Sequence, residues 1–379
     1  MPSRDPMKPA RWIALAPLVL SWACGGGGGD AAKGIPPPAD PCATTPASSQ
    51  IFNVKDAPYG AKGDGITDDT AALQRAVNAA AGTGGTVLVP AGTYMVNAVG
   101  TSNQGIVLKS NLTFAMASGA ELKAIPNASA NYAILIASGI NHVTLTGGTL
   151  TGERGAHSGS TGEWGHGLSI GGGSQAIKVV GLTVKECWGD GIYVGLASEL
   201  TFCGVVADHN RRQGMSITAA NHVQIRNSTF KNTAGTLPEC GIDLEPNSGD
   251  TVNDVLITGC TFTHNAGGGL QDGVPIAYSG LSHTLNVVVD GNTFTSNGAG
   301  TLSSSPRSGI EVSNIAGHRI TNNTVTLTTG NGILLRNGVT GTTVSGNTVT
   351  NNTQHGIFEY LSSGNTISGN TVSGNGLTP

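Results

Sequence analysis

The chain has 379 residues and a formal net charge of −4, with 58 glycines but only 4% aromatic and 11% charged residues. With this small negative net charge the chain lacks the positively charged surface that nucleic acid binding needs, which excludes that class of partner. Abundant Gly, Thr, Asn and Val with few aromatic residues predict a β-rich chain with many turns rather than a helical protein.

The N-terminal 23 residues predict an export signal. Three basic residues precede the apolar run WIALAPLVLSW, which is too short to span a bilayer as a stable helix. Ala23, Cys24 and five glycines follow, an arrangement similar to a bacterial lipoprotein signal, whose cysteine becomes the lipidated N-terminus. Ser21 and Trp22 depart from that pattern, so ordinary cleavage after Ala23 stays open. We expect an exported protein, periplasmic or extracellular, or an outer-membrane lipoprotein that meets the membrane only through its lipid.

Residues 24–50 are rich in Gly, Pro, Ala and Ser, which is typical of a flexible tether. The predicted organisation is a signal at 1–23, a tether at 24–50 and one folded domain at 51–379. Six cysteines in an exported chain permit disulfides. With Cys24 set aside, five remain, and four of these lie in the repeat region without the spacing of a metal site: Cys187, Cys203, Cys240 and Cys260. We expect buried or stacked thiols, with room for one bridge.

A helix is predicted near the start of the folded domain. Thr67 is placed to cap it, with Asp68 and Asp69 in the first turn, where the positive end of the helix dipole favours them. Gly82 ends the helix, and its apolar residues form one stripe: Leu73, Ala76, Val77 and Ala80.

Residues 52–96, FNVKDAPYGAKGDGITDDTAALQRAVNAAAGTGGTVLVPAGTYMV, resemble the N-terminal cap of the pectate-lyase-like superfamily, which includes polygalacturonases, rhamnogalacturonases and phage tailspikes. The resemblance implies a β-helix whose open end the helix plugs, with carbohydrate as the ligand. Asp64, Asp68 and Asp69 are then structural residues of the cap rather than a metal loop. Because fold alone does not determine function, the activity has to be inferred from the site residues.

A four-residue pattern of glycine, apolar, variable and apolar residues recurs along the rest of the chain. It starts at seven glycines, with a further copy near Gly268: Gly167, Gly191, Gly214, Gly241, Gly309, Gly332 and Gly356. A repeat of about 24 residues indicates a solenoid, and the short alternating segments indicate strands. The predicted fold is all-β, a single-stranded right-handed parallel β-helix with an N-terminal capping α-helix. Asn in the recurring SGN and GNT turns is expected in the left-handed conformation, with side chains stacked from rung to rung.

Each rung buries its apolar residues, so the residues two and four positions after the glycine face solvent. The first outward column contains Ser169, Tyr193, Ser216, Asp243, Glu311, Leu334 and Phe358. The second contains Gly171, Gly195, Thr218, Glu245, Ser313, Arg336 and Tyr360. We therefore expect Asp243 and Glu245, in the stretch CGIDLEPN, to be exposed side by side on one face.

Charged and aromatic residues, sparse elsewhere, concentrate in the four consecutive coils that end with this stretch. The candidate catalytic acids are Asp243, Glu245, Asp190 and Asp208. The candidate substrate-binding residues are Trp164, Trp188 and Tyr193, which can stack on sugars, Arg211 and Arg212, which can pair with a carboxylate or sulfate, and Glu163, His166 and His209. A structural alternative is a salt-bridge network of Asp208, Arg211 and Arg212 at a turn.

The sequence GHG at 165–167 is similar to a polygalacturonase signature, but it lies upstream of the acids rather than downstream. We therefore do not assign the family's role to His166.

Three functions fit these residues. A hydrolase needs two carboxyl groups roughly 5 to 9.5 Å apart, and alternate residues of a strand lie about 6.6 to 6.8 Å apart. We therefore expect a hydrolase, acting on an acidic polysaccharide. This reaction needs no cofactor or metal. A lyase would eliminate across a uronate, with His166, His209, Arg211 and Arg212 central and Ca²⁺ on Asp190, Asp208 and Asp243. A non-catalytic glycan-binding surface protein would use the same groove, and a trimer would resemble the tailspike arrangement.

Overall fold

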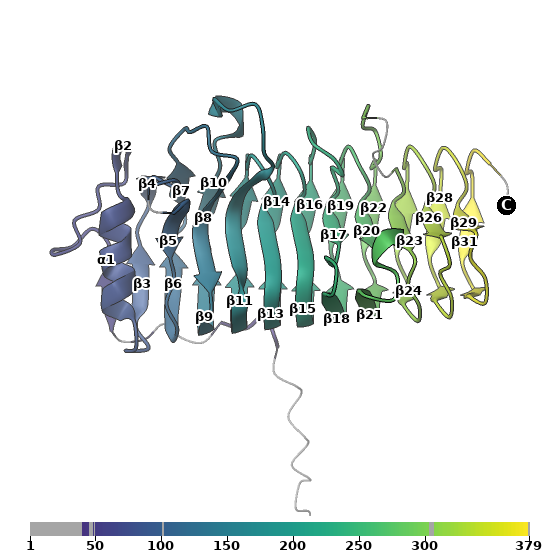
Figure 1. Cartoon of the computed structure of the whole chain (residues 1–379), viewed down its shortest axis with the longest axis horizontal. Coiled ribbons are helices and arrows are strands. Elements are labelled where there is room, and N and C mark those ends of the chain that lie inside the picture. The colour runs from purple at the N-terminus through teal and green to yellow at the C-terminus, as the bar shows by residue number, and fades with distance from the viewer. Residues whose placement is uncertain (1–39, 45–47, 49, 101, 303–306, 378–379) are drawn as a thin grey trace, which may run out of the picture. The chain divides into compact units, whose positions relative to one another are not determined.

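The computed structural model describes residues 40–44, 48, 50–100, 102–302 and 307–377. The predicted export signal, Cys24 and most of the predicted tether lie outside these residues. No helix among the described residues has the length and apolar character needed to cross a membrane. The described residues from Pro41 onward form one compact unit, and every strand pairing described in it is parallel, as expected for the predicted β-helix (Figure 1).

The strands of the described residues form two sheets. In the 19-stranded sheet, one column of strands, called the site column, consists of β5 (Gln104–Val107), β8 (Asn131–Ser138), the first halves of β11 (Trp164–Val180), β13 (Ile192–Cys203) and β15 (Met215–Arg226), then β17 (Ile242–Leu244), β20 (Leu270–Gly273), β23 (Ile310–Ser313), β26 (Ile333–Arg336) and β29 (Ile357–Tyr360). The other column, called the flank column, consists of β1 (Ile51–Asn53), β3 (Thr86–Val89), β6 (Leu112–Met116), β9 (Asn141–Thr146), the second halves of β11, β13 and β15, then β18 (Thr251–Thr258), β21 (His283–Asp290), β24 (Arg319–Thr321), β27 (Thr343–Ser345) and β30 (Thr366–Ser368).

The 12-stranded sheet, called the back sheet, closes each coil. It consists of β2 (Asp64–Asp68), β4 (Gly92–Val96), β7 (Ala120–Ala124), β10 (Thr149–Thr151), β12 (Thr183–Lys185), β14 (Val206–Asp208), β16 (Thr229–Lys231), β19 (Thr261–Thr263), β22 (Thr293–Thr295), β25 (Thr324–Thr326), β28 (Thr348–Thr350) and β31 (Thr371–Ser373). Two short 3₁₀ helices lie in loops, η1 (Arg154–Ala156) and η2 (Ile276–Tyr278).

The single α-helix of the described residues, α1 (Thr70–Ala80), lies across the N-terminal end of the stack (Figure 1). Its apolar stripe is fully buried as predicted, but its N-cap is Asp69 rather than Thr67. Asp68 and Asp69 precede the first turn instead of lying in it. The Asp69 carboxylate accepts the backbone N–H groups of Lys62 and Gly63, at 2.6 and 2.9 Å, so it fastens the loop before the helix.

The interior of the coil is filled by stacked residues from successive rungs. Phe230, Phe262 and Phe294 stack with ring centroids 5.3 and 4.4 Å apart. Buried Asn side chains form ladders: Oδ1 of Asn323 accepts the backbone N–H and the Nδ2 group of Asn292 on the preceding rung, at 2.9 and 3.0 Å. The predicted stacking of Asn is therefore confirmed. The left-handed residue of the SGN turns is, however, glycine, as at Gly346 with φ 68°, because glycine adopts positive φ without steric cost.

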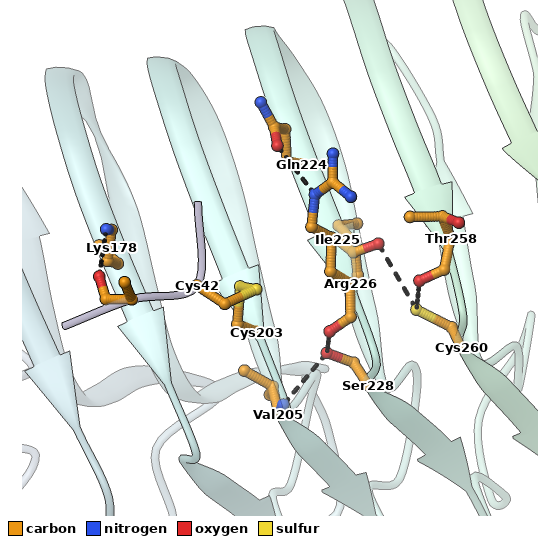
Figure 2. The surroundings of a disulfide bond; sticks show 11 residues. Cys42, Lys178, Cys203, Val205, Gln224, Ile225, Arg226, Ser228, Thr258 and Cys260 are labelled. Atoms are coloured by element: carbon orange, nitrogen blue, oxygen red, sulfur yellow. Dashed lines mark hydrogen bonds between the residues drawn. A yellow bond between two sulfur atoms is a disulfide. The ribbon is translucent and has the colours of Figure 1, made fainter. Parts of the chain in front are cut away.

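One disulfide, between Cys42 and Cys203, joins the segment before β1 to the end of β13 (Figure 2). Beside it the Lys178 ammonium donates to the backbone oxygen of Ala43 at 2.9 Å. The remaining cysteines of the described residues are buried free thiols: Cys187, Cys240 and Cys260. One bridge among buried thiols agrees with expectation. The bridge shows, however, that residues around Cys42 are fastened to the coil, so this part of the predicted 24–50 tether is not a free linker.

Replacing Cys42 by Ser is expected to lower the free energy of unfolding by about 2–4 kcal/mol, because the bridge restricts the unfolded chain over a sequence separation of 161 residues. Urea denaturation of both proteins without reductant measures the loss. The control is Cys260→Ser, which removes a buried thiol and no bridge. A midpoint for Cys42→Ser equal to that of the unchanged protein would show that the bridge adds no stability.

Candidate functional site

A groove with a volume of about 620 Å³ lies over the site column, where two of the predicted acids and two of the predicted aromatic residues come together. Its walls carry Glu163, Trp164, His166, Asp190, Tyr193, Arg212 and Glu245, together with Asn131, Ser169, Thr218 and Asn247. A second hollow of about 370 Å³ shares four of these residues and continues to β5: Asn131, His166, Ser169 and Tyr193. The two hollows form one groove that crosses the strands from β5 to the loop after β17.

The strand register that builds the groove is the predicted one. Ser169, Tyr193, Ser216 and Asp243 are successive partners on neighbouring strands. Gln271 on β20 follows Asp243, so the copy of the repeat near Gly268 is a complete rung. Ile242 and Leu244, on either side of Asp243, are fully buried core residues.

The expectation that Asp243 and Glu245 are exposed side by side is wrong for Asp243, which is only 1% exposed. Gln213 covers it from the preceding rung, and its Nε2 donates to Asp243 Oδ2 at 2.8 Å. Glu245 follows the end of β17, and its side chain is 27% exposed. Glu245 therefore lines the groove, while Asp243 lies beneath it.

Arg212 is the centre of the site, because three carboxylates surround it. Its Nη1 lies 3.4 Å from both oxygens of Asp190 and 3.1 Å from Glu245 Oε1. Its Nη2 donates to Glu245 Oε2 at 3.2 Å, and its Nε lies 3.5 Å from Glu163 Oε2. Ser216 Oγ donates to Asp190 Oδ2 at 2.8 Å. The guanidinium thus holds the Asp190 and Glu245 carboxyl groups in fixed relative positions.

The titration of these acids follows from their burial. Burial raises the pKa of Asp190 to about 6, although the charge of Arg212 works against the rise. Burial also raises the pKa of Glu245, and it raises the pKa of Asp243 well above the usual range, assisted in Asp243 by the neighbouring Glu245 charge. Carboxyl groups with raised pKa values in a groove are typical of acid–base catalysis.

His166 faces the groove as a neutral imidazole. Burial, with the Arg212 charge, lowers its pKa to about 3. Its Nδ1 accepts the backbone N–H of Asp190 at 3.3 Å, and its ring stacks on Tyr193 with centroids 5.1 Å apart. The acceptor role of Nδ1 leaves the proton of the neutral ring on Nε2.

Trp188 does not face the groove as a sugar-stacking residue, contrary to expectation. The His157 ring stacks on it at 3.8 Å, and the Arg211 guanidinium lies 3.8 Å from the centroid of its ring. Arg211 Nη1 also donates to the backbone oxygens of Gly162 and Trp188, at 3.0 and 3.2 Å. Both residues therefore anchor the loop 152–163, which leads into Glu163 and Trp164 on the groove wall.

Asp208 and His209 lie elsewhere, at the end of β14 on the back sheet. Asp208 Oδ2 is 3.4 Å from Lys231 Nζ, and its Oδ1 is 2.5 Å from His209 Nδ1. Its strand partners are Lys185 and Lys231, so it belongs to a column of alternating charge. The predicted Asp208–Arg211–Arg212 network is therefore not formed, and Asp208 does not join Asp190 and Asp243 in a Ca²⁺ site. Among the described residues no cluster of three or more acidic, His or Cys side chains is arranged to hold a metal.

Gln213 and Ser216 are site residues that the sequence interpretation missed. Gln213 immediately precedes the glycine of its rung, as Asp190 does in the rung before. Equivalent positions in successive coils stack on one another, so this shared position was a usable signal for Gln213. Ser216 stood in the predicted outward column but lacked any chemical signal.

Arg211→Ala is expected to loosen the loop 152–163, because the substitution removes two hydrogen bonds and the guanidinium contact on Trp188. Trypsin should then cleave after Arg154, inside this loop, about tenfold faster, since proteolysis follows local opening. The rate can be measured by mass spectrometry of the released fragments. Arg226→Ala, on the flank column, is the control. Equal cleavage of Arg211→Ala and the unchanged protein would contradict the anchoring role.

Comparison with known proteins gives two family matches. The family described as "Right handed beta helix region" matches residues 100–277 and 239–378. The family described as "Rhamnogalacturonase A/epimerase, pectate lyase-like" matches residues 51–113, the region of the cap.

Individual relatives cover smaller parts of the chain. The uncharacterised protein YclG of Bacillus subtilis is 31% identical over 225 residues, 52% of this chain and 38% of YclG. Mannuronan C5-epimerase AlgE4 of Azotobacter vinelandii is 35% identical over 150 residues, 37% of this chain and 27% of AlgE4. The chain therefore spans less than two fifths of these relatives.

The solved structures agree on the fold. The A-module of AlgE4 has a TM-score of 0.67 at 22% identity, covering 87% of this chain and 97% of the module. The Streptococcus pneumoniae surface adhesin PfbA has a TM-score of 0.59 at 19% identity, covering 87% of this chain and 93% of PfbA. The parallel coil, the capping helix and the two family matches together show that the chain belongs to the right-handed parallel β-helix proteins of the pectate-lyase-like superfamily.

Proposed function

We propose that the groove binds a polysaccharide and that Asp190 and Glu245 hydrolyse a glycosidic bond in it. The observation that carries the proposal is the pair of carboxyl groups held by Arg212. Because Asp190 Oδ2 and Glu245 Oε1 lie 3.4 and 3.1 Å from the same nitrogen, the two oxygens are at most about 6.5 Å apart, an upper bound that falls inside the roughly 5 to 9.5 Å range that glycosidases use. The groove is open to a chain, and Trp164, which is 49% exposed on its wall, offers a ring for a sugar to stack on.

The two acids have different surroundings, which suggests their roles. Glu245 is the more exposed of the two, so it reaches the leaving oxygen as the general acid. Asp190 is buried, and Arg212 and Ser216 hold its oxygens, so it acts from the groove floor as the ionised partner, as a nucleophile or as the base for a water molecule. Asp243, whose pKa is raised well above the usual range by its burial, lies beneath them and positions Gln213. No step in this mechanism uses a cofactor.

The pH profile tests these roles. Asp190 must be ionised to act as a nucleophile or as a base, and its pKa is raised to about 6, so kcat/KM should fall as the pH drops below 6. Glu245 must be protonated, so the rate should also fall at alkaline pH, at a point shifted upward by its raised pKa. A rate that rises steadily from pH 6 to pH 4 would contradict the assignment of Asp190 as the ionised partner.

The names of the relatives favour a second candidate, abstraction of the C5 proton of a uronate. Mannuronan C5-epimerases of Azotobacter vinelandii are 34–35% identical over 150 residues, and its alginate lyase 7 is 52% identical over 64 residues. In this reaction Tyr193 would take the proton, and Arg212 would face the uronate carboxylate. Both side chains line the groove.

Product analysis separates the candidates. Hydrolysis gives new reducing ends without ultraviolet absorbance, and elimination gives the absorbance of an unsaturated uronate. Epimerisation in D₂O gives deuterium at C5 without new ends. Binding without any of these products indicates a non-catalytic surface protein. The double variant Asp190→Asn with Glu245→Gln is the blank, and a product that this variant still forms does not come from the proposed pair.

A further inference from the structure

The charge of the groove restricts the sugar that can lie against Arg212, an inference that rests on the proposed function of the groove as a glycan site. Arg212 is the only Lys or Arg on the described walls of the groove and of its continuation toward β5. Each of its three nitrogens already faces a carboxylate at 3.1 to 3.5 Å: Asp190, Glu245 or Glu163. A substrate carboxylate would have to compete with these three carboxyl groups for the guanidinium.

No other positively charged side chain described near the groove is free to replace Arg212 as a partner for a substrate carboxylate. Arg211 is held against Trp188 and two backbone oxygens, and Arg154 Nη1 donates to the backbone oxygen of His209 at 2.8 Å. His166 faces the groove but is neutral, since its pKa is lowered to about 3. Arg211 and Arg212 were expected to bind an acidic substrate. Both side chains are already engaged within the protein, so neither offers a free positive charge to a substrate carboxylate.

The remaining charge in the groove is negative. Three carboxyl groups, Glu163, Asp190 and Glu245, line its described walls against the single guanidinium of Arg212. The Glu163 side chain is 36% exposed and is followed in the chain by Trp164, which is 49% exposed on the same wall. A carboxylate beside an exposed indole ring attracts an ammonium group through both charge and cation–π contact. The same pair repels a carboxylate.

We infer that the groove selects a glycan whose sugar at Arg212 carries no carboxylate, and that it binds a hexosamine chain with free amino groups more tightly than a polyuronate. Glu163 and Trp164 are the residues that recognise the amino group. A neutral chain of the same length binds with intermediate affinity.

Calorimetric titration at pH 7 and low salt tests this order with three probes: a β-1,4-linked glucosamine hexamer, its N-acetylated counterpart and a mannuronate hexamer. The glucosamine hexamer is expected to bind on the order of tenfold more tightly than the mannuronate hexamer, and the difference should shrink at high salt because exposed charges are screened. Tighter binding of the mannuronate hexamer than of the N-acetylated one would overturn the inference.

Two variants make the test specific. Glu163→Gln should reduce the preference for the amino-bearing hexamer severalfold without changing the affinity for the N-acetylated one. Glu199→Gln, an exposed acid on the flank column, should leave the preference unchanged, and an equal effect of both variants would contradict recognition by Glu163. Because the readout is binding, the inference stands if the order holds without cleavage. If neutral chains are cleaved but the mannuronate hexamer binds most tightly, the inference about charge is wrong while the proposed function of the groove stands.

Discussion

Replacing Asp190 by Asn or Glu245 by Gln is expected to lower kcat by a factor of 10² or more, with the affinity for the glycan changed only severalfold. Each substitution removes a titrating group from the reaction and keeps the shape of the side chain, and a positioned acid or base typically contributes 10² to 10⁴ to a rate. The double variant should be little slower than the slower single variant, because the two groups act as a unit. Initial rates and calorimetric titration with the same oligosaccharide separate turnover from binding.

Glu311→Gln is the matched control for this experiment. Glu311 lies in the same outward column two rungs beyond Asp243, is buried, and pairs with an arginine, since its Oε1 accepts from Arg336 Nε at 2.7 Å. It lies outside the groove, so its substitution should leave kcat unchanged. If Asp190→Asn and Glu245→Gln keep full activity while Tyr193→Phe abolishes it, hydrolysis is excluded and C5 chemistry becomes the better explanation.

The fold was predictable because its signals are local and repeated. The glycine that opens each rung sets the strand register, and that register places Ser169, Tyr193, Ser216 and Asp243 in one column, as predicted. The register gives the direction of a side chain but not what covers it. Asp243 points outward, yet Gln213 closes over it from a turn whose path the repeat does not determine.

Contacts made by irregular segments were not predictable for the same reason. The loop 152–163 is an insertion between two rungs, and it brings His157 onto one face of Trp188 while Arg211 covers the other. The sequence shows two aromatic residues and an arginine close to the acids, which is equally typical of a sugar site. The partner of Cys203 also lies outside the repeat, at Cys42, and spacing does not determine disulfide connectivity.

An acidic side chain, Asp272, lies inside the coil, where it pairs with a histidine. At the inward position that Leu244 holds on β17, the next rung has Asp272, which is 1% exposed. Its Oδ2 lies 3.0 Å from Nε2 of His318, which is also buried. An acid is therefore accepted in the core where a histidine faces it, as expected from the cost of burying an unpaired charge.

Leu244→Asp is accordingly expected to unfold or aggregate the protein, whereas Asp243→Asn, one residue away, should change the free energy of unfolding by less than about 1 kcal/mol. Leu244 is fully buried, with Ile217 as its partner on β15. An acid there loses the packing of a leucine, about 2–5 kcal/mol, and gains no histidine. Asn at position 243 keeps the shape of the buried Asp243, whose pKa is raised by its burial, and can still accept from Gln213. Yield of soluble protein and urea denaturation measure both effects. If Leu244→Asp instead melts like the unchanged protein while Asp243→Asn unfolds, the register is off by one residue and Asp243, not Leu244, packs in the core.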